Sequence, residues 1–331
     1  MKRTLALALA ALLIIAAPLA AAPGAGASRI VVREAGNRLV AVPASGGPAR
    51  LLARAPNGAL VGSSASANGS VVAFTSRTSG KTSGGPTMTD RIWVRRAGAR
   101  PQVIRTVVSV GRDRQFSPVD AISLSPDGRR LLATQRGGTV LAMRADGTGV
   151  HRVAVPGFRF SGGPHPNGSG AKFTPDGHRI IAALEATTGE AEFECGVALV
   201  PLGGGSARFL RTGRKSGGIS RYTAPALSPD GHTVAFLERL RDRERLLVMR
   251  LDGSGAHEVA RPLSSDWSLE NPVFSPSGRA LAFVADRVFS GGTIAAVSPS
   301  RIYTVRASGQ RLRIAQAEKV HRYIRNPTWV R

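Results

Sequence analysis

The sequence is poor in cysteine, aromatic residues and acidic residues. Cys195 is the only cysteine in 331 residues, so no disulfide can form within the chain, and we expect it to be a small buried apolar side chain. Aromatic residues make up 5% of the chain, and 21 acidic residues face 45 basic ones. The formal net charge of +24 attracts anionic partners. Only five of the basic residues are lysine, however, and GC-rich coding also produces such an arginine-rich composition.

Beyond its N-terminus the sequence has no apolar run that could span a bilayer. Basic residues precede an apolar run at residues 5–17, and a small-residue cleavage site ends at Ala27. This layout predicts a secretory signal peptide at residues 1–27. The alternative is a retained membrane anchor, because residues 5–22 are just long enough to cross a bilayer. A cleaved signal leaves no transmembrane span and predicts an exported protein, either periplasmic or extracellular and associated with the cell wall.

The sequence also lacks the patterns of common catalytic sites. It contains no nucleophile elbow, no Walker loop and no dinucleotide-binding fingerprint. No pair of its six histidines has the spacing of a zinc site. We therefore expect no catalytic residues, no metal among the histidines and no cofactor.

What the sequence does contain is one hairpin repeated six times. The copies occupy residues 38–47, 91–98, 139–147, 196–204, 245–253 and 301–309. A second signature, which reads Ser-Pro-Asp-Gly or a close variant, precedes five of them and starts at residues 66, 125, 174, 228 and 275. A repeat of about 50 residues that is rich in short alternating strands predicts a propeller or a similar array.

The backbone conformation of the turn in the second signature explains why glycine and aspartate occur there. A tight turn needs a positive φ, which glycine adopts without a steric penalty, and an aspartate side chain accepts hydrogen bonds from nearby backbone N–H groups. The predicted structural turn residues are Gly69, Gly128, Gly177, Gly231, Gly278, Asp127, Asp176 and Asp230. His151, His178, His232 and His257 recur at equivalent positions near the turns. We expect these histidines to lie far from one another on the tight-turn rim.

These repeats predict an all-β fold, a six-bladed β-propeller with four antiparallel strands per blade. Residues 29–53 supply three strands, and the C-terminal innermost strand at residues 326–331 completes their blade, so the ring closes without a long open edge. The other predicted blades cover residues 58–105, 118–155, 169–212, 223–262 and 271–317. Residues 28–331 are thus expected to form one domain. A cation in the central channel remains an open alternative.

Residues 125–149 resemble a known repeat. Their Ser-Pro-Asp-Gly-Arg-Arg-Leu and Met-Arg-Ala-Asp-Gly-Thr-Gly segments are similar to the WD40-like PD40 repeat of TolB-type six-bladed propellers. The resemblance covers about residues 29–331 and implies a non-enzymatic, periplasmic binding module. In that family the propeller engages a peptidoglycan-associated lipoprotein, but TolB proteins carry an α/β domain before the propeller, whereas here the strands begin at Arg29. From this resemblance we therefore infer the fold and a general partner-binding role, and not the particular partner.

The long, dissimilar connections of this propeller are predicted to share one rim, which we call the loop face. They are residues 78–90, 105–120, 156–171, 187–194, 212–223, 261–271 and 286–300. Aromatic residues and arginines gather there, as they do in interface hot spots. The hypothetical binding residues are Arg112, Arg114, Phe116, Arg159, Phe160, Arg221, Tyr222, Trp267 and Phe289. The alternative is that the aromatic rings pack beneath the rim as structural residues.

Three functions stay open at this point. The first is an exported, non-enzymatic module that mediates protein or cell-envelope interactions through the loop face. The second is a lyase or hydrolase acting on an acidic polysaccharide, for which His165 is the one histidine expected on the loop face. The third is charge-driven attachment to a wall polymer. We expect the first, with an envelope protein or an anionic cell-wall polymer as partner, no specific nucleic acid and a monomeric state.

Overall fold

The computed structural model describes fourteen segments of the chain. They are residues 28–34, 37–45, 47–55, 59–83, 85–110, 118–161, 170–187, 193–214, 221–240, 244–262, 267–287, 301–309, 313–316 and 325–330. The predicted signal peptide at residues 1–27 lies outside the described residues.

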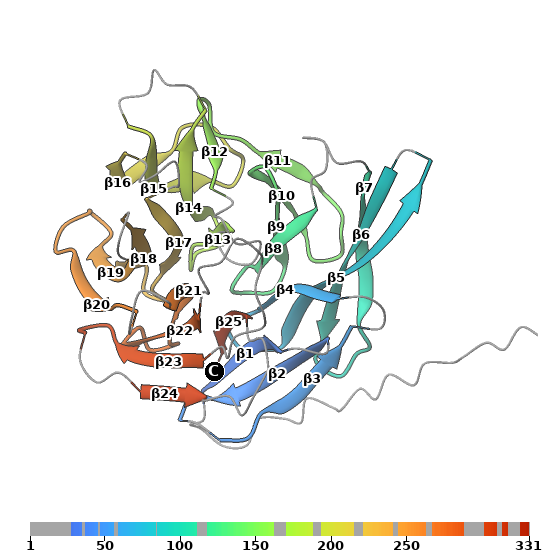
Figure 1. Cartoon of the computed structure of the whole chain (residues 1–331), viewed down its shortest axis with the longest axis horizontal. Helices are drawn as coiled ribbons and strands as arrows, with labels where there is room; N and C mark the ends of the chain where they lie inside the picture. Colours follow the sequence, from blue (N-terminus) through green and yellow to red (C-terminus); the bar gives the residue numbers. More distant parts are fainter. Residues whose placement is uncertain are drawn as a thin grey trace, which may run out of the picture.

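Six twisted antiparallel sheets surround a central axis (Figure 1). Blade 1 consists of β25 (Arg325–Val330), β1 (Arg29–Glu34), β2 (Arg38–Pro43) and β3 (Arg50–Arg54). Blade 2 consists of β4 (Ala59–Ala65), β5 (Val71–Thr82), β6 (Gly85–Arg96) and β7 (Gln102–Val110). Blade 3 consists of β8 (Val119–Leu124), β9 (Arg130–Gln135), β10 (Thr139–Arg144) and β11 (His151–Val153).

The second half of the ring continues this order. Blade 4 consists of β12 (Phe158–Phe160), β13 (Lys172–Phe173), β14 (Arg179–Ala186), β15 (Cys195–Pro201) and β16 (Arg208–Gly213). Blade 5 consists of β17 (Tyr222–Leu227), β18 (Thr233–Arg239), β19 (Glu244–Arg250) and β20 (His257–Ala260). Blade 6 consists of β21 (Trp267–Phe274), β22 (Ala280–Arg287), β23 (Arg301–Arg306) and β24 (Arg313–Gln316). Both β12 and β13 pair with β14, so two short strands share the innermost position of blade 4.

This arrangement confirms the predicted all-β six-bladed propeller and its closure. The last strand, β25, pairs antiparallel with β1, so that Val330 lies opposite Arg29 and Thr328 opposite Val31. The strand from one end of the chain thereby becomes the innermost strand of the blade formed by the other end (Figure 1). The hydrogen bonds of this ladder hold the ring shut without any covalent link.

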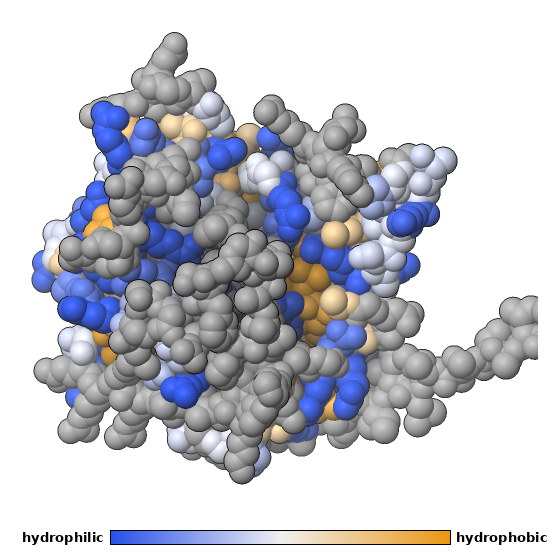
Figure 2. All heavy atoms as spheres, in the orientation of Figure 1, coloured by the Kyte–Doolittle hydropathy of each residue, from blue (hydrophilic) through white to orange (hydrophobic). Residues whose placement is uncertain are grey.

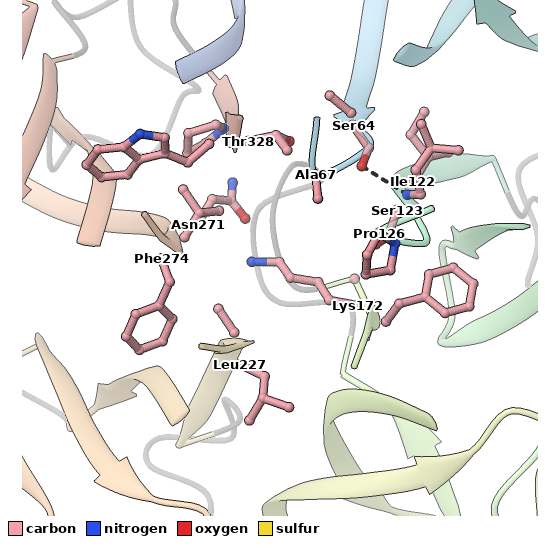
Figure 3. Close-up of a pocket in the computed structure, with 18 of the residues that line it drawn as sticks. Ser64, Ala67, Ile122, Ser123, Pro126, Lys172, Leu227, Asn271, Phe274 and Thr328 are labelled. Atoms are coloured by element: carbon pink, nitrogen blue, oxygen red, sulfur yellow. Dashed lines mark hydrogen bonds between the residues drawn. The ribbon is translucent and has the colours of Figure 1, made fainter. Parts of the chain in front are cut away.

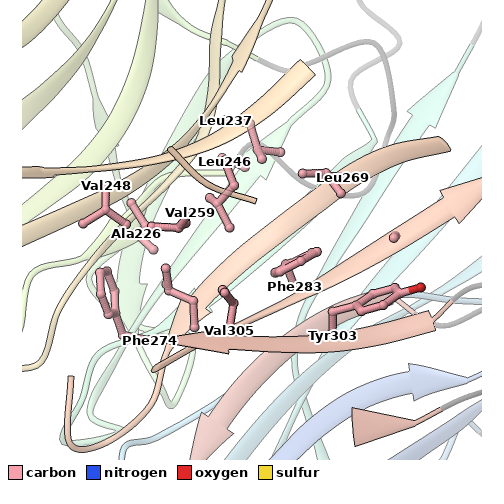
Figure 4. Packing of buried hydrophobic residues seen from close by; sticks show 14 residues of the cluster. Ala226, Leu237, Leu246, Val248, Val259, Leu269, Phe274, Phe283, Tyr303 and Val305 are labelled. Atoms are coloured by element: carbon pink, nitrogen blue, oxygen red, sulfur yellow. The ribbon is translucent and has the colours of Figure 1, made fainter. Parts of the chain in front are cut away.

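The apolar core lies mainly between neighbouring blades. Figure 4 shows the cluster between blades 5 and 6, where Leu246 and Val248 of β19 face Phe283 of β22 and Tyr303 of β23. Similar clusters join the other blades, and most of their members are valine, leucine, isoleucine and alanine. Each sheet has two faces, and a neighbour on each side buries both of them.

Most innermost strands are interrupted by a β-bulge. The pairing register shifts within β4, β8, β17, β21 and β25. In β17 and β21 the bulge contains a residue with positive φ just before a proline, namely Ala224 at 50° and Asn271 at 49°. A bulge leaves a residue outside the regular ladder and re-aims its backbone groups. These bulges therefore release backbone groups near the central axis.

Residues 78–90, predicted as a loop, instead continue a hairpin. β5 and β6 are each twelve residues long, and their pairing runs from Val71 opposite Arg96 to Thr82 opposite Gly85. The hairpin projects from the ring, with β7 along its outer edge (Figure 1). Threonine, which suits strands, is the commonest residue there, and a sequence window of this kind does not distinguish a polar strand from a loop. Among the described residues no helix has the length and apolar character needed to cross a membrane.

Candidate functional site

A pocket of about 370 Å³ occupies the central channel. Its walls come from the innermost strand of five blades and from β13 of blade 4 (Figure 3). The lining includes Ala67, Pro126, Pro175 and Pro229, each the second residue of the turn that follows β4, β8, β13 or β17. The pocket therefore reaches the tight-turn rim, on the opposite side from the loop face. Small-molecule sites typically have volumes of about 300–1,000 Å³.

Lys172 is the only ionisable residue among the described residues that line this pocket. Its ammonium donates a hydrogen bond of 3.0 Å to the carbonyl oxygen of Pro272, which is 100 residues away in the chain and lies within the bulge of β21. Burial lowers the pKa of Lys172 to about 8, because the surroundings solvate the charged amine poorly. The sequence analysis did not identify Lys172 as a site residue. The one feature that could have indicated it is its position in the repeat, where the other copies have an uncharged residue: Ser64, Ser123, Ala226, Val273 or Thr328.

Away from the pocket, a recurrent clasp joins one blade to the next near the loop face. In blade 2, Arg77 Nε lies 2.7 Å from Asp90 Oδ1, and the pair holds Val119 of blade 3. Asp90 Oδ2 accepts the Val119 N–H at 2.7 Å, while Arg77 Nη2 donates to its carbonyl oxygen at 2.8 Å. The buried carboxylate of Asp90 thus joins two blades through one backbone residue.

The same clasp recurs at two other junctions. Glu244 of blade 5 pairs with Arg239 at 2.6 Å and accepts the N–H of Leu269 of blade 6 at 2.7 Å. Between blades 1 and 2, an amide replaces the carboxylate, since Asn37 Oδ1 accepts the Leu60 N–H at 3.2 Å. Arg33 donates to the carbonyl oxygen of Leu60. These arginines and acceptors are therefore structural groups that join neighbouring blades.

Two of the predicted arginines are engaged in ion pairs within their own blades. Arg159 Nη2 lies 2.9 Å from Glu185 Oε2, and Arg221 Nη2 lies 2.8 Å from Glu238 Oε1. Glu238 also pairs with Arg245 at 2.6 Å. Burial alone would raise the pKa of Glu238, but the hydrogen bonds from Arg245 and Arg221 outweigh it, so its pKa lies below the usual value.

The predicted aromatic residues separate into buried and accessible ones. Phe160 and Tyr222 are 3% and 2% exposed and belong to the cores of blade junctions. Trp267 is half-buried at the start of β21, and the Arg301 guanidinium lies 5.2 Å from the centre of its ring. Arg112, Arg114, Phe116 and Phe289 lie outside the described residues, as does His165.

The predicted turn residues form one repeated hydrogen-bond pattern. Gly69, Gly128, Gly177, Gly231 and Gly278 have φ between 69° and 75°. Asp127, Asp176 and Asp230 each accept the side-chain hydroxyl of the first turn residue and the backbone N–H two residues further on. Asn68 makes the same contacts in blade 2. The hydrogen bond from Thr174 lowers the pKa of Asp176, and that from Ser228 lowers the pKa of Asp230.

Two of the tight-turn histidines bridge neighbouring blades. The ring nitrogens of His151 lie 3.3 Å from the oxygen of Gly149 and 3.2 Å from that of Leu202 in blade 4. His257 repeats this contact with Gly255 and with Ala307 of blade 6, both at 3.1 Å. In the part of the chain that the structure describes, no three His, Cys, Asp or Glu residues come together in a way that could hold a metal ion. Cys195 is fully buried, as expected.

The described surface is mainly hydrophilic on the face seen in Figure 2. Apolar side chains show through between hydrophilic ones near β4 and β5. The more exposed large apolar residues include Val103, Val108 and Val110, all of β7. Such isolated valines on an edge strand are ordinary, and the concave central pocket is the feature best suited to hold a small ligand.

The fold is shared with several solved structures. TolB from Acinetobacter baumannii superposes with a TM-score of 0.62 at 17% identity, covering 93% of this chain and 68% of that one. A putative TolB from Agrobacterium tumefaciens gives 0.55 at 14% identity, covering 93% of this chain and 100% of that one. The tricorn protease gives 0.52 at 12% identity over 88% of this chain and 26% of that one. No protein-family model matches the chain, and no curated protein matches its sequence.

These similarities identify the architecture as a TolB-like six-bladed β-propeller. At such low identity they show the fold alone, and unrelated activities occur on this scaffold. The assignment of the repeats to the PD40 type stays a prediction.

Proposed function

We propose that this protein is an exported, non-enzymatic binding module that recognises a protein or another component of the cell envelope through its loop face. The observation that carries the proposal is the pair formed by Trp267 and Arg301. The ring is partly accessible at the start of β21, and the guanidinium lies 5.2 Å from its centre. Tryptophan and arginine are the side chains most enriched in the hot spots of protein interfaces.

The rest of the molecule supports a scaffold role. Several described carboxylates are already engaged by arginines within or between blades, as in Asp90 with Arg77 and Glu238 with Arg221 and Arg245. The chain nevertheless carries a formal net charge of +24, so much of its positive charge remains for an acidic partner. Similarity to TolB agrees with this role at the level of the fold. Export rests on the predicted signal peptide at residues 1–27.

A pull-down from an envelope extract at low and at high salt tests the proposal. The bait is the purified protein, and the variant carries both Trp267→Ala and Arg301→Ala. Arg100→Ala is the matched control, because it removes the same charge beside the turn between β6 and β7 on the opposite rim. We expect a defined protein to stay bound at high salt and to be lost in the double variant but not in the control. Desolvated aromatic contacts, unlike exposed charges, persist when salt screens the solution.

The opposite result is equally defined. Retention of anionic polymer alone, released by salt and unaffected by the double variant, would overturn the proposal in favour of charge-driven attachment. Release of unsaturated or shortened sugars from an acidic polysaccharide, measured with the same preparation, would instead establish the lyase or hydrolase alternative.

A further inference from the structure

The central pocket contains one charged group in otherwise uncharged surroundings. Its described lining is made of aliphatic, aromatic, hydroxyl and amide side chains, together with the Lys172 ammonium. The Lys172 side chain is partly buried, and a charge removed from water is costly unless an opposite charge or several hydrogen bonds compensate for it. Lysines are also scarce in this chain, so a lysine at this position stands out among forty arginines elsewhere.

The protein supplies Lys172 with only part of that compensation. An ammonium has three N–H donors, and here one donates to the Pro272 carbonyl oxygen at 3.0 Å. Among the described residues no carboxylate lies within ion-pair distance of this ammonium, and burial is the sole influence on its titration. Two donors and a positive charge therefore face the cavity without an anionic partner from the described part of the chain.

The geometry presents this charge to the cavity. β13 places Lys172 opposite Ile181 of β14, and the side chain reaches across the channel from blade 4 to blade 6. The bulge of β21 between Glu270 and Val273 releases the Pro272 carbonyl from the ladder, so it can accept this bond. In Figure 3 the amine of Lys172 projects into the cavity on the side of Asn271.

The pocket walls indicate the kind of anion. Asn271 lies on the side to which the amine points (Figure 3). Thr328 adds a hydroxyl to the lining, while Leu227, Phe274 and Trp329 supply apolar walls. One positive charge matches a singly charged carboxylate better than a dianionic phosphate, which arginine forks and several donors usually hold. The apolar walls suit a hydrocarbon or aromatic body attached to the carboxylate.

We propose that the central pocket binds a carboxylate with an apolar body, and that the Lys172 ammonium is its charge partner. The carboxylate belongs either to a small organic acid or to the carboxyl terminus of a peptide with an apolar last residue. The site reaches the tight-turn rim, so it is separate from the loop face, and failure of either proposal leaves the other standing. A carboxylate would accept the two remaining N–H donors and neutralise the partly buried charge.

Titration calorimetry with matched ligand pairs tests this inference. One pair is 3-phenylpropionate and its uncharged amide, and the other is acetyl-Ala-Ala-Phe with a free or an amidated carboxyl terminus. We expect the wild-type protein to prefer a carboxylate over the matching amide by about tenfold or more, as for a charged hydrogen bond in a poorly solvated site. The pair that binds more tightly identifies the source.

Variants separate the amine from general charge effects. Lys172→Met keeps the length of the side chain and removes its charge, and we expect it to lose the preference for the carboxylate. Lys81→Met removes the same charge from an exposed site on β5 and should bind as the wild type does. Equal binding of acid and amide, an unchanged preference in Lys172→Met, or no binding of any carboxylate at about 10 mM overturns the inference.

A spectroscopic measurement on the unmutated side chain gives an independent test. Biosynthetic incorporation of ¹³C-lysine labels the lysines without changing their amines, and the five lysines of the chain give a spectrum simple enough to assign with Lys172→Met. No other described titratable side chain lines the pocket, so the signal of Lys172 should titrate near pH 8. Saturating 3-phenylpropionate or peptide should move that titration to higher pH. A titration that neither ligand moves contradicts binding at this amine.

Discussion

At the residue scale, this fold depends on a few glycines that have a positive φ and are also closely packed. Gly128 and Gly177 have nearly the same backbone conformation, with φ of 71° and 69°, but different surroundings. A Cβ atom on Gly128 would lie 2.7 Å from Val71 Cγ2, whereas on Gly177 it would meet only the end of Arg130, at 4.0 Å. The pair therefore separates backbone strain from steric overlap.

We expect Gly177→Ala to lower the free energy of unfolding by about 1 kcal/mol, which is the strain of a left-handed alanine. Gly128→Ala should cost about 2–3 kcal/mol, because the neighbouring blade must also shift. Urea denaturation followed by circular dichroism measures both values. Gly177→Ala is the control, because it introduces the backbone strain without the steric overlap. Equal losses in the two variants would show that the contact with Val71 is of no consequence.

A second prediction concerns Lys172 and its effect on stability. Burial lowers its pKa from the ordinary lysine value of 10.5 to about 8. Between these two pH values the unfolded chain binds a proton that the folded chain does not, so stability rises with pH across this window. At pH 7 the folded protein carries this partly buried charge, and Lys172→Met should increase the free energy of unfolding by about 1–3 kcal/mol.

The stability gain of Lys172→Met should shrink as the pH rises from 8 to about 10.5, because the wild-type amine becomes neutral in the folded state. Urea denaturation of both proteins at pH 7 and pH 10 measures the two differences. Lys81→Met, which alters an exposed lysine, should show no such change with pH. A gain that is the same at both pH values would mean that the charge of Lys172 is not the cause.

At the element scale, the clasps determine how one sheet is held against the next. Asp90 is completely buried and holds both the Arg77 guanidinium and the Val119 N–H. Burial raises the pKa of the nearby Asp120, although Arg136 and Arg77 partly oppose this effect. The junction between blades 2 and 3 thus contains acidic and basic side chains that compensate one another's charge.

We expect Asp90→Ala to reduce the free energy of unfolding by about 3–5 kcal/mol, because it leaves the partly buried Arg77 without its closest carboxylate and the Val119 N–H without its acceptor. Asp90→Asn keeps an acceptor and should cost less, about 1–2 kcal/mol, since Asn37 already plays this part between blades 1 and 2. Chemical denaturation of the two variants gives the comparison. If Asp90→Asn proved as damaging as Asp90→Ala, the negative charge, and not the acceptor, would be the essential feature.

At the scale of the whole molecule, stability depends on closing the ring. Blade 1 is built from both ends of the chain, and Trp329 and Val330 of β25 pack into two separate apolar clusters. Without β25, the inner edge of β1 and the clusters on both sides of blade 1 would be open to water. A propeller cannot compensate for such a gap locally, because every blade covers its neighbours.

We expect removal of residues 325–331 to lower the thermal midpoint by roughly 10 °C or more and to broaden the transition. Removal of Arg331 alone is the control, because that residue follows the last residue of β25. A synthetic peptide of residues 325–331 should restore the midpoint by pairing with β1. Differential scanning calorimetry measures all three effects, and a truncated chain that melts like the full one would argue against closure by this strand.

The sequence by itself determined the architecture, because the requirements of turns and strands are local. A turn glycine with positive φ, such as Gly128, and the alternation of apolar residues after it recur in five of the six repeats and predict the blades. The match between Asn271-Pro272 and Asn326-Pro327 was enough to predict that the last strand closes the ring. Some predicted connections instead contain strands. Residues 78–90 continue the hairpin of β5 and β6, since polar β-branched residues suit a strand as well as a loop, and residues 158–160 form β12.

Only the tertiary structure decided which side chains meet. Tyr222 and Phe160 belong to inter-blade cores, and the clasps bring Arg77 and Asp90 to the backbone of Val119. Lys172 reaches Pro272 across 100 residues of sequence. Such contacts depend on the curvature of the ring and on bulges in its inner strands, and no short window of sequence contains that information. Closure of the ring therefore places Lys172, a lysine found in only one repeat, in the central pocket, where it is the one charged side chain among the described lining residues.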